Sequence, residues 1–185
     1  FLADQIRTFK KEHSQVQFNI HSAIADDIKE RLEKGTLDIG LLTEPVDIGK
    51  YEFIRMPLKE CWGVLVRKNS RLASKSTIHP EDLLETPLLM VRREMVKNEL
   101  ASWFGDYYDK IHIAATYNLI INAATMVRSG VGVALCFDFG MNFYDDLCFI
   151  PFEPCLETGS VLVWKKNQIM STVISHFLSH VRNAV

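Results

Sequence analysis

The stretch IADDIKERLEKGTLDIGLL, residues 24–42, holds one helix-to-strand transition that decides the fold class. Apolar residues recur at the spacing of a single helical face through Ile24–Leu32, and Gly35 follows where a glycine commonly ends a helix. Residues 37–42 are nearly all apolar, which is typical of a strand covered on both faces. A helix followed by such a strand is a recurring unit of α/β folds.

Helices and strands continue to alternate on both sides of this stretch. Leu2, Ile6 and Phe9 place the start of the chain inside a helix, and residues 16–21 alternate apolar with polar side chains as in a half-buried strand. This order predicts an α/β fold with mostly parallel sheets. Further strands are predicted at residues 60–67, 88–91, 111–113, 131–136 and 161–164, and further helices from Pro80, through Val96–Phe104, from a capping Asn118 to Gly130, and after a capping Ser171.

A polar run at Lys68–Thr77 separates two groups of these elements. The last strand and helix follow the second group, and if they return to the first group, the chain crosses between two lobes twice. We therefore expect two Rossmann-like lobes joined by two crossing segments, with a cleft at the carboxyl ends of their strands. The expected lobes are residues 1–67 plus 163–185 and residues 68–162.

The composition argues against a nucleic-acid-binding surface and against a membrane span. Of the 185 residues, 48% are hydrophobic and 24% are charged, and the net charge is −2. Nucleic-acid binders usually carry a basic stripe, so we expect this chain not to bind DNA by itself. Phe1–Lys10 has no signal-peptide pattern, and no run approaches roughly 18 apolar residues, so we expect a cytoplasmic protein with no membrane partner.

Cysteine and histidine spacings predict no metal site. The four cysteines form no CxxC pair, and the apolar surroundings of Cys61 and Cys136 are typical of buried thiols in a reducing compartment. His176 and His180 are spaced to share a metal, but their amphipathic helix favours a solvent-facing pair. No GxSxG, HExxH, P-loop or GxGxxG motif occurs, so we expect no enzyme, no catalytic residue and no cofactor.

Three segments, in this order and spacing, resemble the LysR-type transcription regulators. They are Glu33–Asp47 (EKGTLDIGLLTEPVD), Gly63–Met90 and Met126–Leu135 (MVRSGVGVAL), and the resemblance covers essentially the whole chain. It implies a type 2 periplasmic-binding-protein-like fold that binds a small-molecule effector between its lobes and modulates DNA binding by a helix-turn-helix head. We expect that head, and the first strand of the first lobe, to be absent here, because Phe1 falls within the first helix. Asn69–Arg71 departs from the family's his-pro, which concerns only the linker.

The same resemblance implies self-association as a dimer or tetramer through the helices at Leu2–Lys11 and Leu119–Arg128. It implies contact with DNA only through the absent head.

Two other functions are compatible with this architecture. The first alternative is an extracytoplasmic solute-binding protein of a transporter, which shares the bilobal fold. The second alternative is an enzyme on the same fold.

Strand and helix ends supply the candidate effector-binding residues, because free amides and oriented side chains meet there. Thr43 and Glu44 follow one predicted strand. Arg92 and Arg93 follow another, and arginine binds a carboxylate, such as that of an organic anion, through two hydrogen bonds. By resemblance, the helix start near Thr116 also contacts effectors.

Each candidate has a structural interpretation as well. Thr43 can cap a loop, Ser22 and Asn118 can cap helices, the two arginines can be a solvated pair, and Phe137 can belong to the core. Glu44 could instead favour a cationic ligand. The expected effector-binding residues are Ser22, Ile24, Thr43, Glu44, Arg92, Arg93, Thr116, Asn118 and Phe137.

Overall fold

The computed structural model describes residues 1–138, 140 and 144–185, which form two compact units. Unit 1 contains Phe1–Lys59 and Gly159–Val185, and unit 2 contains Glu60–Thr158. These boundaries differ from the expected ones at residues 67 and 162. Residues 60–67, which we expected in the first lobe, lie in unit 2 because they pair with strands of that unit.

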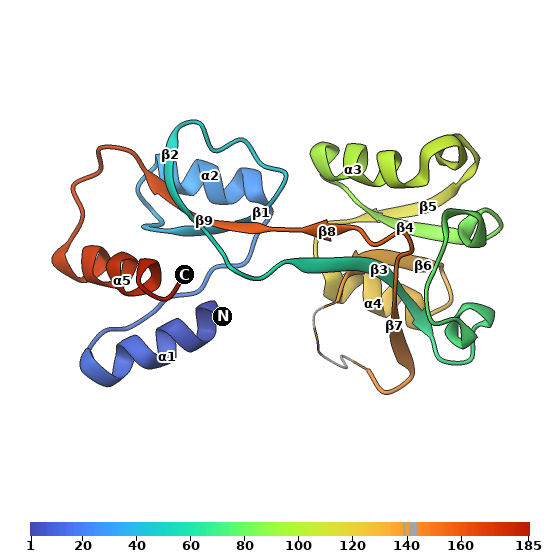
Figure 1. The fold of residues 1–185 in the computed structure, drawn as a ribbon, viewed down its shortest axis with the longest axis horizontal. Helices are drawn as coiled ribbons and strands as arrows, with labels where there is room; N and C mark the ends of the chain where they lie inside the picture. The colour runs from blue at the N-terminus through green and yellow to red at the C-terminus, as the bar shows by residue number, and fades with distance from the viewer. Residues whose placement is uncertain (139, 141–143) are drawn as a thin grey trace. The chain divides into compact units, whose positions relative to one another are not determined.

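Unit 1 is built on a three-stranded antiparallel sheet in the order β1-β9-β2 (Figure 1). The central strand β9 comes from the C-terminal part of the chain and pairs with both other strands. Unit 1 therefore depends on both ends of the chain. Its strands are β1 (Gly40–Thr43), β2 (Tyr51–Arg55) and β9 (Ser160–Lys165), and its helices are α1 (Leu2–Glu12), α2 (Ala25–Glu33) and α5 (Thr172–Arg182).

Side chains of β9 alternate between two layers of the unit 1 core. Leu162 and Trp164 pack with α1 and α5, which lie side by side, whereas Val161 and Val163 pack with α2 on the other face (Figure 1). This two-residue period is the one expected of a strand that is covered on both sides.

Two predictions for unit 1 are wrong. Residues 16–21 form no strand, because no described strand pairs with them, although Val16 and Phe18 are half-buried against the α1–α5 layer. The strand predicted at residues 37–42 is not covered on both faces, because Leu41 is 46% exposed. The helices α1 and α5 pack over β2 and β9 and leave that side of β1 open.

Gly40 allows α2 to lie close to the sheet. A Cβ at this position would be 2.7 Å from Ile28 Cγ2 and 3.2 Å from Leu32 Cδ1, both of which are buried on α2. A side chain at residue 40 would therefore push the helix away from β1 and β9.

We predict that Gly40→Ala lowers the free energy of unfolding by about 1–3 kcal/mol, the usual range for overpacking a core. Chemical denaturation monitored by circular dichroism measures this. Gly49→Ala is the matched control, because the only close atom there is Asp47 Oδ1 at 3.4 Å, and its effect should stay within about 0.5 kcal/mol. Equal effects of the two substitutions would contradict the close helix–sheet contact.

Unit 2 is built on a six-stranded sheet in the order β5-β4-β6-β3-β7, with β8 paired to β3. β4 is parallel to β5 and β6, but β3 is antiparallel to β6, β7 and β8, so the sheets are mixed rather than mostly parallel. The strands are β3 (Glu60–Arg67), β4 (Pro87–Val91), β5 (His112–Tyr117), β6 (Val133–Phe137), β7 (Leu147–Pro151) and β8 (Glu157–Thr158), and the helices are α3 (Glu94–Phe104), α4 (Ile120–Arg128) and the 3₁₀ helices η1 (Arg71–Ser74), η2 (Pro80–Leu83) and η3 (Gly105–Lys110).

The helices α3 and α4 cover opposite faces of the unit 2 sheet (Figure 1). Val64 and Val66 of β3 pack in the layer of α3, and Leu65 packs in the layer of α4. In β4, Leu88 and Leu89 divide between the layers in the same way, so the central strands are apolar on both sides.

Several predicted helix ends are confirmed. Gly35 and Gly130 have positive φ angles of 67° and 78° just past α2 and α4. Pro80 is the first residue of η2, and the Ser171 hydroxyl accepts a hydrogen bond from the Ile174 amide at 3.4 Å. Among the described residues, no helix is long and apolar enough to cross a membrane.

Candidate functional site

The carboxyl ends of β4 and β5 meet the starts of two helices in unit 2. Val91 and Tyr117 end these strands and are partners in the parallel pairing. The amide of Arg92 donates to the carbonyl of Tyr117 at 3.0 Å and holds the two strand ends together. Because α3 begins at Glu94 and α4 at Ile120, both helix N-termini lie just beyond the same edge of the sheet.

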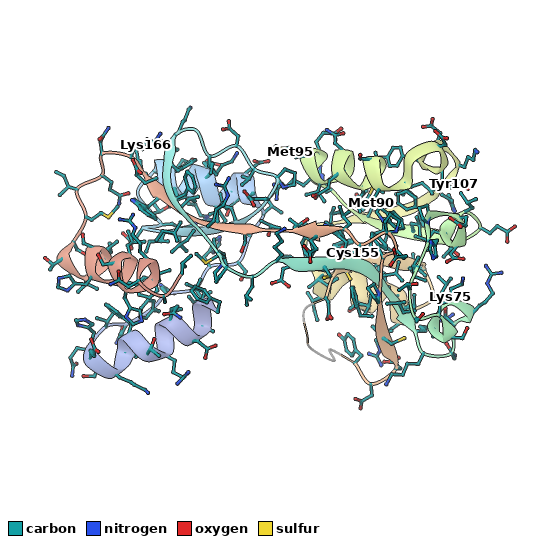
Figure 2. The ribbon with its side chains drawn as sticks, viewed as in Figure 1. Lys75, Met90, Met95, Tyr107, Cys155 and Lys166 are labelled. Atoms are coloured by element: carbon teal, nitrogen blue, oxygen red, sulfur yellow. The ribbon has the colours of Figure 1, made fainter. Side chains whose placement is uncertain are left out.

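Neither helix start is capped by the side chain of its own N-cap residue. Arg93 is the N-cap residue of α3 and Leu119 that of α4, and neither makes a side-chain capping hydrogen bond. The first amides of a helix have no partner within the helix and carry the positive end of its dipole, so this edge favours an anion. Met95, in the first turn of α3, is exposed and adds apolar surface (Figure 2).

Most predicted site residues of unit 2 come from this edge. Arg92 and Asn118 are exposed directly after β4 and β5, Thr116 is exposed within β5, and Arg93 is half-buried and has partners of its own. The prediction that Asn118 caps a helix is wrong, because the N-cap position belongs to Leu119.

Phe137 ends β6, the strand on the other side of β4. Its ring centroid lies 4.1 Å from that of Trp62 at the start of β3, and Phe137 is half-buried. The aromatic pair joins the ends of two antiparallel strands, so Phe137 contributes both to the core and to the sheet edge.

A buried hydrogen-bond chain lies behind this aromatic pair. Trp62 Nε1 donates to the Thr158 hydroxyl at 2.8 Å, and that hydroxyl donates to the carboxylate of Glu99 on α3, with both oxygens at 3.3 Å. Thr158 is only 2% exposed. The chain ties β3, β8 and α3 together, and the sequence analysis missed it because Trp62 and Thr158 belong to no shared motif.

We predict that Thr158→Val lowers the free energy of unfolding by about 1–3 kcal/mol, because it leaves the indole N–H of Trp62 buried without an acceptor. The shape of the side chain is almost unchanged, so packing contributes little. Denaturant unfolding followed by tryptophan fluorescence measures the effect. Thr125→Val, on an exposed part of α4, is the control and should change stability by at most about 0.5 kcal/mol. A Thr158→Val chain as stable as this control would show that the hydrogen bond contributes nothing.

In unit 1, Thr43 is the last residue of β1 and Glu44 follows it, so the strand ends one residue later than predicted. Thr43 pairs with Ser160 of β9, and the amide of Glu44 donates to the carbonyl of Gly159 at 3.0 Å. A carboxylate oxygen of Glu44 lies 3.5 Å from Nη2 of Arg55, so the charge of Glu44 is partly offset and attracts a cationic ligand less strongly than an isolated carboxylate would.

Ser22 and Ile24 precede α2, and both are exposed. Ile24 is the N-cap residue and α2 has no side-chain cap, so of the two interpretations of Ser22, helix capping is wrong. Ala23, between them, packs in the cluster that contains Leu42 of β1. Residues 22–24 are therefore held close to the end of β1 through the packing of Ala23.

Three of the cysteines are held as protonated thiols. Burial raises the pKa of Cys61 and of Cys148, and it raises the pKa of Cys136 to about 12. The thiolate is the reactive form of cysteine, so these side chains are poor nucleophiles at neutral pH. His180 is half-buried with Nε2 2.9 Å from the Thr8 hydroxyl, which places it against α1 rather than on a free solvent face.

The fold matches effector-binding domains of the type 2 periplasmic-binding-protein-like class. The effector-binding domain of QuiR in complex with shikimate has a TM-score of 0.85 at 16% identity, covering 99% of this chain and 89% of that one. The BenM domain with its effector benzoate has a TM-score of 0.76 at 17% identity, covering 99% and 85%. HinK of Pseudomonas aeruginosa, a LysR family transcriptional regulator, has a TM-score of 0.80 at 17% identity, covering 100% and 65%.

Within that class, the chain belongs to the LysR substrate binding domain family, whose profile matches residues 1–185. It is 25% identical over 142 residues to the uncharacterised HTH-type transcriptional regulator YvbU of Bacillus subtilis (strain 168), covering 77% of this chain and 47% of YvbU. It is 23% identical over 198 residues to AlsR of the same strain, covering 99% and 61%. The chain therefore spans about half to three-fifths of these relatives.

These findings confirm the resemblance drawn from the sequence. The domain is the effector-binding part of a LysR-type regulator, a family that is not enzymatic. The alternatives of a transporter's solute-binding protein and of an enzyme are set aside.

Proposed function

We propose that this domain binds a small organic anion and that Arg92, Thr116, Asn118 and the amides at the starts of α3 and α4 contact it in unit 2. The observation that carries the proposal is the pair of helix starts, without N-cap side-chain bonds, at adjacent strand ends. Two partial positive charges on one edge attract an anion, and an exposed arginine supplies a further, full charge.

The ligands of two structural relatives support an anion. QuiR is solved with shikimate and BenM with benzoate, and both compounds are carboxylates. The ion pair between Glu44 and Arg55 partly offsets the negative charge of Glu44, which would otherwise favour a cation. We propose Ser22, Ile24, Thr43 and Glu44 as contacts from unit 1, and Arg93 and Phe137 as further contacts from unit 2.

In the whole regulator, effector binding would change DNA binding by a helix-turn-helix domain, in the cytoplasm. An effector shifts an equilibrium between two arrangements only by its difference in affinity for them. Self-association is part of this proposal, and exposed apolar side chains support it in unit 2: Ile113 on the edge strand β5, and Leu119 and Ile121 beside and on α4. Exposed apolar side chains are candidates for contacts with a second copy of the chain.

We predict that Thr43→Val weakens effector binding by about 1–3 kcal/mol, because a hydroxyl that meets the ligand is lost. A thermal-shift screen of organic acids, including benzoate and shikimate, first finds a ligand that stabilises the folded domain. Calorimetric titration then compares Thr43→Val with Thr36→Val, an exposed threonine in the turn after α2. Unchanged affinity in Thr43→Val would remove Thr43 from the site.

We predict that Arg92→Gln weakens binding of the same anion by roughly tenfold or more, and that added salt reduces this difference. Arg71→Gln is the matched control, because Arg71 is exposed in η1, which follows the carboxyl end of β3 and so lies at the opposite edge of the sheet. If both substitutions change the affinity equally, the loss reflects the net charge of the domain and not a contact between Arg92 and the anion. If no organic anion stabilises the domain, the proposed ligand class is wrong.

A further inference from the structure

Cys61, Cys155 and Glu157 bring their sulfur and carboxylate ligand atoms within 4.8 Å of one another in unit 2. Cys61 is half-buried, whereas Cys155 and Glu157 are exposed, so the cluster is open to solvent. These residues cannot be recognised as metal ligands from the sequence, because Cys61 lies far along the chain from the other two and no pair of cysteines has CxxC spacing.

Strand geometry explains how these residues meet. Cys61 of β3 stands directly opposite Glu157 of β8 in the antiparallel pairing, where side chains lie on the same face. The Trp62 amide donates to the carbonyl of Leu156 at 2.8 Å, so the pairing continues toward Cys155. Cys155 precedes Glu157 by two positions, and its Sγ lies within 4.8 Å of the ligand atoms of Cys61 and Glu157. Figure 2 shows Cys155 beside β3.

Hydrogen bonds hold the backbone around the cluster in place. The carbonyl of Cys61 accepts a bond from the Asp138 amide at 3.0 Å, and the carbonyl of Pro154 accepts one from Trp103 Nε1 at 2.7 Å. Next to Glu157, Thr158 is held by Trp62. Cys61 itself makes one of these hydrogen bonds, and Cys155 and Glu157 each lie next to a residue that makes one. The backbone that carries the three ligand residues is therefore held by hydrogen bonds.

We propose that Cys61, Cys155 and Glu157 form a binding site for Zn²⁺. Thiolate and carboxylate are both ligands of zinc, and thiolates select it over the hard ions Mg²⁺ and Ca²⁺. Binding replaces the proton of each thiol, so one Zn²⁺ ion joins two sulfurs and one carboxylate oxygen and releases two protons. Three protein ligands leave a fourth tetrahedral position for water or another small ligand. The three ligand residues are not among the proposed anion contacts, and the zinc proposal does not rest on the anion proposal.

Cobalt(II) is the probe for this proposal, because thiolate-bound Co²⁺ gives a charge-transfer band whereas Zn²⁺ is colourless. The reduced chain, residues 1–185, should bind one Co²⁺ with this band, and Zn²⁺ should displace it. Cys155→Ser and Glu157→Gln change exposed residues and should leave thermal unfolding of the metal-free chain unchanged. Each should weaken Zn²⁺ binding by more than the roughly 10–100-fold that follows loss of an outer-sphere partner.

Cys148→Ser is the matched control, because Cys148 is a half-buried cysteine of β7 outside the cluster. It should keep the charge-transfer band and the Zn²⁺ affinity. The proposal is overturned if Co²⁺ binds without the band, or if Cys155→Ser binds Zn²⁺ as tightly as the unchanged chain. It is equally overturned if Cys61 and Cys155 stay joined in a disulfide under reducing conditions.

Discussion

The fold of unit 2 depends on one constraint: β3 is buried, so its backbone must find partners along both edges. It pairs with β6 on one side and with β7 and β8 on the other. An unpaired buried peptide group would cost free energy comparable to a lost hydrogen bond. The same constraint fixes Trp62, whose indole N–H needs an acceptor and finds it in Thr158. Glu99 then connects this bond to α3.

This arrangement places helix starts and polar side chains together at one edge of the unit 2 sheet. The strand ends set the positions of two helix starts, and the positive ends of the two helix dipoles attract negative charge. The side chains nearby are an exposed arginine, hydroxyl and amide groups, and an aromatic ring, which are typical of binding rather than of turnover. Burial raises the pKa of Cys136 to about 12, so this side chain stays a protonated thiol at neutral pH.

The sequence predicted the features that depend on local chemistry. The helix ends at Gly35 and Gly130, the cap at Ser171 and the central apolar strands all follow from a few adjacent residues. It failed at residues 16–21, because a strand needs a partner that the local pattern does not reveal, and at Asn118, because capping depends on the exact residue where a helix begins. Family membership came from three ordered segments. The hydrogen bond between Trp62 and Thr158 joins residues 96 positions apart and could not be read from either one.

The proposed anion site at the starts of α3 and α4 can be located by backbone amide NMR during titration with the best-stabilising organic acid. We expect the largest chemical-shift changes in the first turns of these helices, at Glu94–Val96 and Ile120–Asn122. If the ligand binds tightly but the amide resonances of both turns do not move, the anion does not bind at these helix starts.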